Sequence, residues 1–317
     1  MKPKLTIQIV GWNSAKELPA ALATLKTLPS EQVIIRYIDN ASTDDSLALI
    51  KRELPQADII TNDQNVGFGP AHNQGFARCD TDFIMLHNPD LILSWDGVQK
   101  LLSLFDDPKI GAAQGKLLRE RPAAGDSPVI DSAGIVLTSA LNGRERGAGE
   151  IDVGQYDREV EILAVTGAAA LYRMTALRAV AHHTPHGAEY FDHDFFAYKE
   201  DVDLGWRLTR AGWLVLYAPT LQGYHARALR REGLFNWGVN PRTVYARLHS
   251  KRTHYSLRNW LWLMLKNATL LQLIVHSPIV AMRELVMLGF TIVYPPLALA
   301  WWQAVVGLPR MLAKRRN

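Results

Sequence analysis

The chain has 317 residues, of which 48% are hydrophobic and 21% charged, and its formal net charge is +4. This length and balance allow one large or two modest domains with a sizeable core, and they exclude a disordered chain. A single cysteine, Cys79, excludes an internal disulfide and a cysteine-cluster metal site, and it fits a reducing compartment. The apolar run before Gly11 spans about six residues, too short for a signal peptide, so we expect the folded part to stay in the cytoplasm.

Strand-like and helix-like segments alternate along most of the chain. Short β-branched or apolar runs predict strands at residues 5–10, 33–38, 58–60, 83–86, 162–172 and 214–218. Helical spacing of apolar residues predicts helices at 15–27, from a cap at 42–45 to about 54, from the turn at 65–69 to 78, and at 201–211. This alternation predicts a mostly parallel α/β sheet, with ligands beyond the carboxyl ends of its strands.

Polar residues and a glycine-bearing turn follow the second and third predicted strands. Asp39 can accept hydrogen bonds from the imide or ribose of a pyrimidine nucleotide, or it can serve as a helix cap or solvated loop acid. The glycines at 67, 69 and 75 miss the dinucleotide-binding spacing, and no Lys-Ser or Lys-Thr follows them, which excludes a Walker loop. The turn from Asn65 through Gly67 either only starts a helix or presents backbone N–H groups to a ligand.

The fourth predicted strand ends in His87-Asn88-Pro89-Asp90. Pro89 fixes the turn, so we expect the Asp90 carboxylate at the edge of the sheet. Mg²⁺ and Mn²⁺ take oxygen ligands, and one carboxylate suffices when diphosphate oxygens and water complete the shell. The alternative is a turn without a ligand.

Five acidic residues lie among aromatic residues just before and at the start of the last predicted helix. Glu200 and Asp201 can cap that helix, or one of them can act as a general base that deprotonates an acceptor hydroxyl. Asp203 and Arg207 are four residues apart on one helix face and predict a supporting ion pair. His225, after the last strand, is either a lone surface histidine or a metal ligand.

Six stretches, taken in order, resemble family 2 glycosyltransferases, and within them the bacterial rhamnosyltransferase-like group. They are Leu5-Thr-Ile-Gln-Ile-Val-Gly-Trp-Asn, Asp39-Asn-Ala-Ser-Thr-Asp-Asp-Ser, Asn65-Val-Gly-Phe-Gly, Leu86-His-Asn-Pro-Asp-Leu, Thr166-Gly-Ala-Ala-Ala-Leu-Tyr-Arg and Tyr198-Lys-Glu-Asp-Val-Asp-Leu-Gly-Trp-Arg. Each stretch alone is a weak signal, but their common order up to His225 is specific.

The resemblance implies a GT-A fold, which is Rossmann-like with a mostly parallel central sheet. It also implies a nucleoside-diphosphate sugar donor, a divalent metal ion (Mg²⁺ or Mn²⁺) and inversion at the anomeric carbon. By the same resemblance Asp201 would be the catalytic base, with its neighbour Glu200 as the second candidate.

The resemblance also assigns the donor side of the site. Asp39 would contact the nucleotide base and Asp90 would hold the metal ion on the diphosphate. Related families often show Asp-x-Asp at the metal site, whereas here Asn88 takes the first position and leaves Asp90 as the lone carboxylate. His225 matches a histidine that completes the metal shell in some relatives. The expected donor-binding residues are Asp39, Asn65, Gly67, Asn88 and Asp90.

The last fifth of the chain is much more apolar than the rest. Residues 257–282 and 285–306 are apolar runs, and the second has 22 uncharged residues, enough to cross a bilayer. Because Pro295 and Pro296 interrupt its centre, we expect two short helices in or dipping into the membrane interface. A true span, or a soluble helical domain or dimer face, is the alternative. Residues suited to headgroups and anionic lipid are Tyr294, Trp301, Trp302, Arg310, Lys314, Arg315 and Arg316.

We therefore expect a catalytic domain at residues 1–228 and a basic linker with membrane-associated helices at residues 229–317. The start of the second segment carries seven basic residues against one acid. Arg230 and Arg231 would bind the diphosphate of a polyprenyl-linked acceptor, or they belong to an ordinary solvated surface. Trp206 is the third residue expected on the acceptor and membrane side.

The resemblance favours transfer of L-rhamnose from dTDP-rhamnose to a lipid-linked saccharide of a cell-surface polymer, at the cytoplasmic face of the inner membrane. Galactose, glucose or N-acetylglucosamine from a UDP donor is an alternative, as is a non-catalytic nucleotide-sugar-binding membrane protein. Polymerising synthases of the resembled family usually carry a Gln-x-x-Arg-Trp motif after the base. No such string follows the acid pair here, which favours single additions over polymerisation. Nucleic-acid binding is not expected, because the basic residues cluster beside apolar rather than stacking surfaces.

Overall fold

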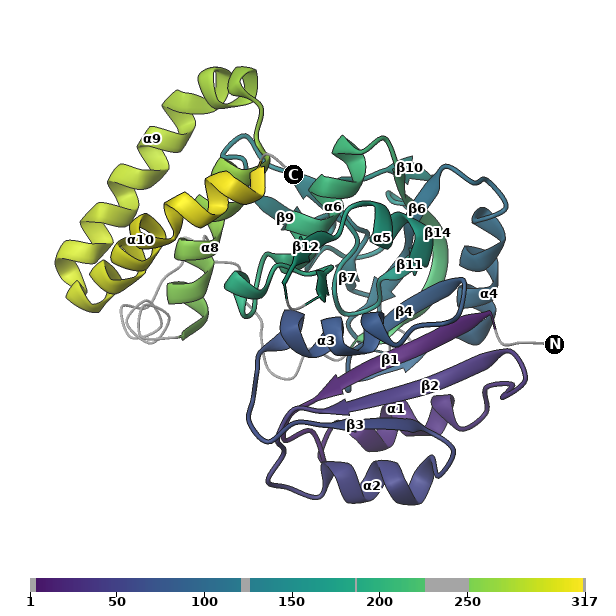
Figure 1. The fold of residues 1–317 in the computed structure, drawn as a ribbon. Helices are drawn as coiled ribbons and strands as arrows, with labels where there is room; N and C mark the ends of the chain where they lie inside the picture. The colour runs from purple at the N-terminus through teal and green to yellow at the C-terminus, as the bar shows by residue number, and fades with distance from the viewer. Residues whose placement is uncertain (1–3, 121–125, 186, 226–250, 316–317) are drawn as a thin grey trace.

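The structure is a computed structural model that describes residues 4–120, 126–185, 187–225 and 251–315 (Figure 1). The first part of the chain alternates strands with helices. Its elements are β1 (Leu5–Gly11), α1 (Leu18–Leu25), β2 (Val33–Asp39), α2 (Ser46–Glu53), β3 (Asp58–Thr61), α3 (Phe68–Ala77), β4 (Phe83–His87), β5 (Leu91–Leu93), α4 (Trp95–Leu104) and β6 (Ile110–Leu118).

The second part has mostly short strands, apart from β14, and it ends in three longer helices. Its elements are β7 (Ile130–Ser132), β8 (Ile135–Leu137), β9 (Gly143–Glu145), β10 (Val160–Glu161), β11 (Leu171–Arg173), α5 (Met174–Ala179), β12 (His182–Thr184), β13 (Gly187–Glu189), η1 (His193–Phe195), α6 (Glu200–Arg210), β14 (Leu214–His225), α8 (Lys251–Asn267), α9 (Leu270–Val293), η2 (Pro295–Leu297) and α10 (Ala298–Arg315).

The main sheet has the strand order β10-β14-β6-β11-β4-β1-β2-β3. β4, β1, β2 and β3 form a parallel block, and β14 is parallel to β6. β11 runs antiparallel to both β4 and β6, so the strands on its two sides point the same way. The ends of β2, β4 and β14 therefore meet at one edge, which is where ligands bind in open α/β sheets.

Helices cover both faces of this sheet. In β1, Leu5, Ile7 and Ile9 point into one core, as the two-residue period of a strand requires. α1, α2 and α4 close that core, while α3, α5 and α6 pack on the opposite face of the sheet. Figure 1 shows α1 and α2 on one side of the β1–β3 block and α3 on the other. The sheet is thus buried between two helical layers.

The C-terminal helices form a third body beside α6 (Figure 1). α8 buries Trp260, Trp262 and Leu263 in an apolar cluster with Trp206 of α6 and Met311 of α10. α9 has no buried residue. Among the described residues, α9 is the one helix long and apolar enough to cross a membrane, judged by its length and composition.

Most predicted elements are present, with three corrections. The strand predicted at 162–172 is wrong, because only Leu171–Arg173 pairs in the sheet and the preceding apolar residues are buried in a loop. The elements β5, α4, β6, α5, β12 and β13 were not predicted, and β14 continues past its predicted end at Ala218 to His225. The prediction of two short helices for the runs 257–282 and 285–306 is wrong, because α8 ends at Asn267 and the 24-residue α9 continues from the first run into the second, through Pro278. The break at Pro295-Pro296 is confirmed.

Candidate active site

Asp39 ends β2 at the carboxyl edge of the sheet. One of its carboxylate oxygens accepts a hydrogen bond from the backbone N–H of Ser42 at 3.1 Å. The other oxygen is buried and has no hydrogen-bond partner among the described residues. A buried acceptor without a partner is uncommon in folded proteins and points to a ligand or water. The structure thus leaves Asp39 an acceptor group for the expected nucleotide.

Asn40 organises the turn that follows β3. Its amide nitrogen donates to Asn65 Oδ1 at 3.0 Å, and its own Oδ1 accepts from the backbone N–H of Val66 at 3.1 Å. Asn65 Oδ1 also accepts from the backbone N–H of Gly67 at 3.0 Å. The side chain of Asn65 is therefore used to shape the turn, and any donor contact would come from the turn's backbone.

Gly67 joins this turn to the loop before the acid pair. Its φ of +96° favours glycine, and a Cβ there would lie 2.7 Å from the carbonyl oxygen of Phe196. The next residue, Phe68, starts α3 and donates its backbone N–H to that same oxygen at 2.9 Å. The expected donor turn and the expected catalytic loop are thus in direct contact.

The candidate metal site gathers residues from β14 and from the segments after β4. His225 Nε2 lies 3.1 Å from Asp90 Oδ1 and 3.2 Å from the amide nitrogen of Asn88. The other ring nitrogen, Nδ1, lies 2.8 Å from Asp131 Oδ2. His225 is buried, so the alternative of a lone surface histidine is wrong. Asp90 and His225, predicted together as metal ligands, are in contact.

The sequence did not point to Asp131, because it lies in the short strand β7, in a region without periodicity. Its carboxylate and that of Asp90 hold opposite sides of the His225 ring. Burial opposes the charged form, but the two carboxylates outweigh it and raise the pKa of His225 to about 9. In this state a proton therefore lies on the imidazole that faces Asp90.

Glu200 and Asp201 occupy the first turn of α6. Asp201 is half-buried, and its carboxylate accepts the backbone N–H groups of Gly167 at 3.2 Å and Val202 at 2.8 Å. Glu200 is buried, and its Oε2 has no hydrogen-bond partner among the described residues. No described cation forms an ion pair with either carboxylate. The two acids therefore differ in access, and Asp201 is the one a ligand can reach.

The pKa values of this pair follow from its surroundings. Burial and the neighbouring Asp201 raise the pKa of Glu200 to about 8. Burial also raises the pKa of Asp201, although its two backbone N–H donors favour the charged form. The pair therefore keeps a proton near neutral pH, and the hydrogen bonds favour Glu200 as its carrier. Neighbouring acids whose surroundings separate their pKa values are typical of acid–base sites.

Two other acids near the start of α6 are paired with cations instead: Asp203 on α6 and Asp192, which precedes η1. Lys266 Nζ lies 2.7 Å from Asp192 Oδ2 and 2.9 Å from Asp203 Oδ2. Arg207 binds Asp203 at 2.9 Å, as predicted, and Lys314 binds Asp192. The cations lower the pKa values of both aspartates.

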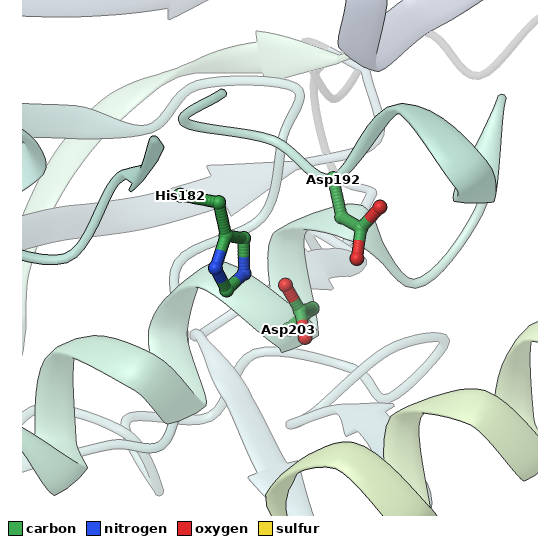
Figure 2. Close-up of side chains that lie close together, drawn as sticks. All are labelled: His182, Asp192 and Asp203. Carbon is green, nitrogen blue, oxygen red and sulfur yellow. The ribbon is translucent and has the colours of Figure 1, made fainter. Parts of the chain in front are cut away.

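His182, Asp192 and Asp203 also lie close enough together to suggest a metal site (Figure 2). The two lysine ammonium groups already occupy carboxylate oxygens of this group, so a metal ion would have to displace them. Burial also lowers the pKa of His182 to about 3. We interpret this cluster as an ion-pair network that joins α6 to α8 and α10.

The remaining predicted residues lie elsewhere. Trp206 is buried between α6 and α8, so its side chain is not available to an acceptor. Arg230 and Arg231 lie outside the described residues, as does the boundary predicted at 228–229. Lys314 and Arg315, expected at anionic lipid, instead bind Asp192 and the backbone at the end of α8.

The large, mostly parallel sheet between two helical layers, with polar groups at its carboxyl edge, is the arrangement of a GT-A fold. A model of the family described as "Glycosyl transferase family 2" matches residues 6–180, more than half of the chain. The chain belongs to this family and is a glycosyltransferase.

The chain is also similar to curated relatives. One is the N-acetylglucosaminyl-diphospho-decaprenol L-rhamnosyltransferase of Mycobacterium tuberculosis, at 26% identity over 255 residues, covering 72% of this chain and 78% of that protein. Another is the poly-beta-1,6-N-acetyl-D-glucosamine synthase of Staphylococcus aureus, at 23% identity over 220 residues, covering 68% of this chain. This chain spans only 48% of that synthase.

Solved structures share the fold. The mannosyltransferase PcManGT of Pyrobaculum calidifontis, solved with GDP-Man and Mn²⁺, superposes with a TM-score of 0.57 at 14% identity, over 100% of this chain and 85% of that one. GalNAc-T7, solved with UDP, GalNAc and Mn²⁺, has a TM-score of 0.54 at 11% identity, over 84% of this chain and 48% of that one.

Proposed function

We propose that this glycosyltransferase moves L-rhamnose from dTDP-rhamnose, with inversion, to a saccharide carried on a membrane lipid. The observation that carries the reaction type is the acid pair at the start of α6, which is desolvated and forms no ion pair with a described cation, although Lys199 lies next to it in the chain. The choice of rhamnose and of a lipid-linked acceptor rests on the similarity to the mycobacterial L-rhamnosyltransferase. Transfer of another hexose from a UDP donor is the alternative to transfer of rhamnose.

The donor binds, on this proposal, along the carboxyl edge of the sheet. Asp39 supplies the free carboxylate oxygen for the nucleotide base, and the backbone of the turn through Gly67 lies beside it. Asn88 and Asp90 lie at the end of β4, two strands from β2, where the diphosphate would follow. A nucleotide bound in this direction places its sugar toward Gly167 and the acid pair.

The donor set at Asp90 and His225 fits a divalent metal ion. A carboxylate oxygen faces an imidazole nitrogen at 3.1 Å, and Asp131 holds the ring in that orientation. When bound, Mg²⁺ or Mn²⁺ would offset charge that develops on the departing diphosphate. Mn²⁺ accompanies the nucleotide sugar in the PcManGT structure, which supports this proposal.

Asp201 acts as the general base in this mechanism. It takes the proton of the acceptor hydroxyl while that oxygen attacks the anomeric carbon from the side opposite the diphosphate, which inverts the configuration. The backbone N–H groups of Gly167 and Val202 fix its carboxylate. Glu200 keeps a proton and so adds no second negative charge.

We place the enzyme at the cytoplasmic face of the membrane, held there by α9. Its exposed residues include Leu271, Ile279 and Leu285, at 70%, 47% and 65% exposure. Its charged residues Arg283 and Glu284 are half-buried, and the Arg283 guanidinium lies 3.6 Å from the centre of the Trp260 ring. A helix with polar groups inward and apolar groups outward suits lipid better than water. Leu285→Lys should weaken binding to lipid vesicles, whereas Val153→Lys on the catalytic body should not.

The function is tested by transfer of labelled sugar from dTDP and UDP donors to a polyprenyl-diphosphate saccharide, with metal ion or with chelator. We expect metal-dependent product from dTDP-rhamnose, and loss of that product in Asp201→Asn. Product from a UDP donor alone would reassign the sugar. Product that persists in Asp201→Asn would move the base to Glu200.

A further inference from the structure

The loop that leads into the acid pair has an unusual backbone. Phe196, Tyr198 and Lys199 have φ angles of +61°, +69° and +77°, a left-handed conformation that residues with a side chain rarely adopt. Residues held in such conformations persist only when surrounding contacts enforce them. Because Lys199 directly precedes Glu200, this loop sets where α6 begins and where both acids point.

Asn259 of α8 supplies contacts of that kind. Its side chain is fully buried, and the amide nitrogen lies 2.9 Å from the Phe195 carbonyl oxygen, 2.9 Å from that of Ala197 and 2.8 Å from that of Tyr198. Only the nitrogen end of an amide can donate to carbonyl oxygens, so these three acceptors fix the orientation of the side chain.

Arg258, the preceding residue, completes the arrangement. Its guanidinium donates to the carbonyl oxygens of Asp194 at 2.9 Å and Phe195 at 3.1 Å. Its Nε also donates to Asn259 Oδ1 at 2.9 Å, which satisfies the other end of the amide. Two adjacent side chains of α8 thus bind four carbonyl groups of residues 194–198.

We infer that Asn259 and Arg258 are positioning residues of the glycosyl transfer, which hold the loop in the conformation that presents Glu200 and Asp201. They touch neither of the two acids and act through the loop backbone. The loop also reaches the donor side, since the Phe196 carbonyl accepts from Phe68 at the start of α3. The inference rests on the proposed role of the acid pair. It makes α8 part of the catalytic machinery, although the helix lies outside the family-matched residues 6–180.

The test compares Asn259→Ala with Asn73→Ala in the full chain. Asn73 is also a buried asparagine with three hydrogen bonds to backbone groups, those of Tyr190 and Phe191, which lie before the loop. Both variants lose the same kind of contact, so both should lower the melting temperature. Only Asn259→Ala should speed hydrogen exchange at residues 196–200, by about tenfold. It should also lower kcat about 10- to 100-fold and displace the acid limb of its pH profile.

Equal exchange at residues 196–200 in the two variants would overturn the inference, as would faster exchange in Asn259→Ala with an unchanged kcat. If Asn259→Ala does not fold, Arg258→Lys serves instead, because the single ammonium nitrogen of a lysine cannot take both the Nε and the Nη2 positions from which Arg258 donates. The exchange measurement needs no acceptor. It therefore separates this inference from the base assignment, which fails on its own if Asp201→Asn stays active.

Discussion

Two groups of acids lie at and near the start of α6, and their surroundings are opposite: Glu200 and Asp201 form the first, and Asp203 of α6 with Asp192, which precedes η1, forms the second. Glu200 and Asp201 form no ion pair with a described cation, and burial raises their pKa values although the neighbouring Lys199 opposes this. Asp203, together with Asp192, is enclosed by Lys266, and the pKa values of these two acids are lowered. Glu200, Asp192 and Asp203 are all buried, so the ion pairs of the two aspartates, and not burial, make the difference between them and Glu200.

The two groups differ in whether a buried carboxylate can accept a proton from a substrate. A carboxylate held between ammonium groups has lost most of its basicity, and removing it would leave the cations uncompensated. A carboxylate that burial has made more basic can take a proton from a substrate at neutral pH. Asp201 is of the second kind and Asp203 of the first, although they are two residues apart.

The largest expected effect separates these two aspartates by activity. Asp201→Asn should lower kcat by about 10²–10⁴-fold, the usual contribution of a general base, with little change in stability. Asp203→Asn should destabilise the protein but leave kcat per folded molecule within about an order of magnitude, because Asp203 does not face the substrate. Steady-state kinetics on protein quantified by active nucleotide binding measures both. Equal loss of kcat in the two variants would contradict the division.

The next largest effect is expected at Lys266, the cation between Asp192 and Asp203. Lys266→Met should lower the free energy of unfolding by about 3–5 kcal/mol, because it leaves two buried carboxylates short of a partner. Urea unfolding of the full chain in detergent measures this. Lys100→Met is the matched control, since Lys100 forms an exposed pair with Asp96 and such pairs contribute about 1 kcal/mol at most. A loss no larger than in the control would show that Lys266 is not needed for the cluster.

The acid pair Glu200 and Asp201 could be predicted from the sequence, whereas the ion-pair network around Asp192 and Asp203 could be predicted only in part. The acid pair could be found because both residues adjoin a helix start and match the family's order of motifs. The pairing of Asp203 with Arg207 follows from four-residue spacing. Lys266 could not be assigned to Asp203, because 63 positions separate them and only packing of α8 on α6 brings them together.

Local sequence patterns likewise predict some strands and site residues and not others. The parallel block of β1 to β4 could be predicted because each strand is a short β-branched or apolar run between turn signals. β6 lies at the centre of the sheet, yet its Gly-Ala-Ala-Gln-Gly-Lys interior lacks the residues that favour strands, so burial on both faces overrides local preference. Asp131 is 94 positions from His225, and no local pattern links them.

A third prediction asks which acid group binds metal. Asp131→Asn should weaken Mn²⁺ binding about 10- to 100-fold, because the carboxylate that orients His225 is lost. Asp192→Asn should leave Mn²⁺ affinity unchanged, since Lys266 and Lys314 occupy that group. Titration of Mn²⁺ followed by electron paramagnetic resonance, with a nucleoside diphosphate present, measures the Mn²⁺ affinity of both variants. The reverse pattern would place the metal ion at His182, Asp192 and Asp203.

The smallest expected effect is a difference in pH dependence. Because the pKa of Glu200 is raised from 4.5 to about 8, the folded protein keeps a proton that the unfolded chain releases between these pH values. Raising the pH through this window therefore lowers the free energy of unfolding, and one unit of pKa shift corresponds to about 1.4 kcal/mol. Asp192 and Asp203 have lowered pKa values, so their contribution has the opposite sign and is lost only as the pH falls below the ordinary carboxyl range.

Glu200→Gln cannot release this proton. Its free energy of unfolding should therefore fall less than that of the wild type between pH 5 and pH 8, by at least about 1.4 kcal/mol. Urea unfolding across this pH range measures the difference, and Glu161→Gln on the exposed edge strand β10 is the control. Parallel curves for wild type and Glu200→Gln would mean that Glu200 is ionised throughout. The acid pair would then carry two charges, and Lys199, the cation that acts on both acids, would have to offset them.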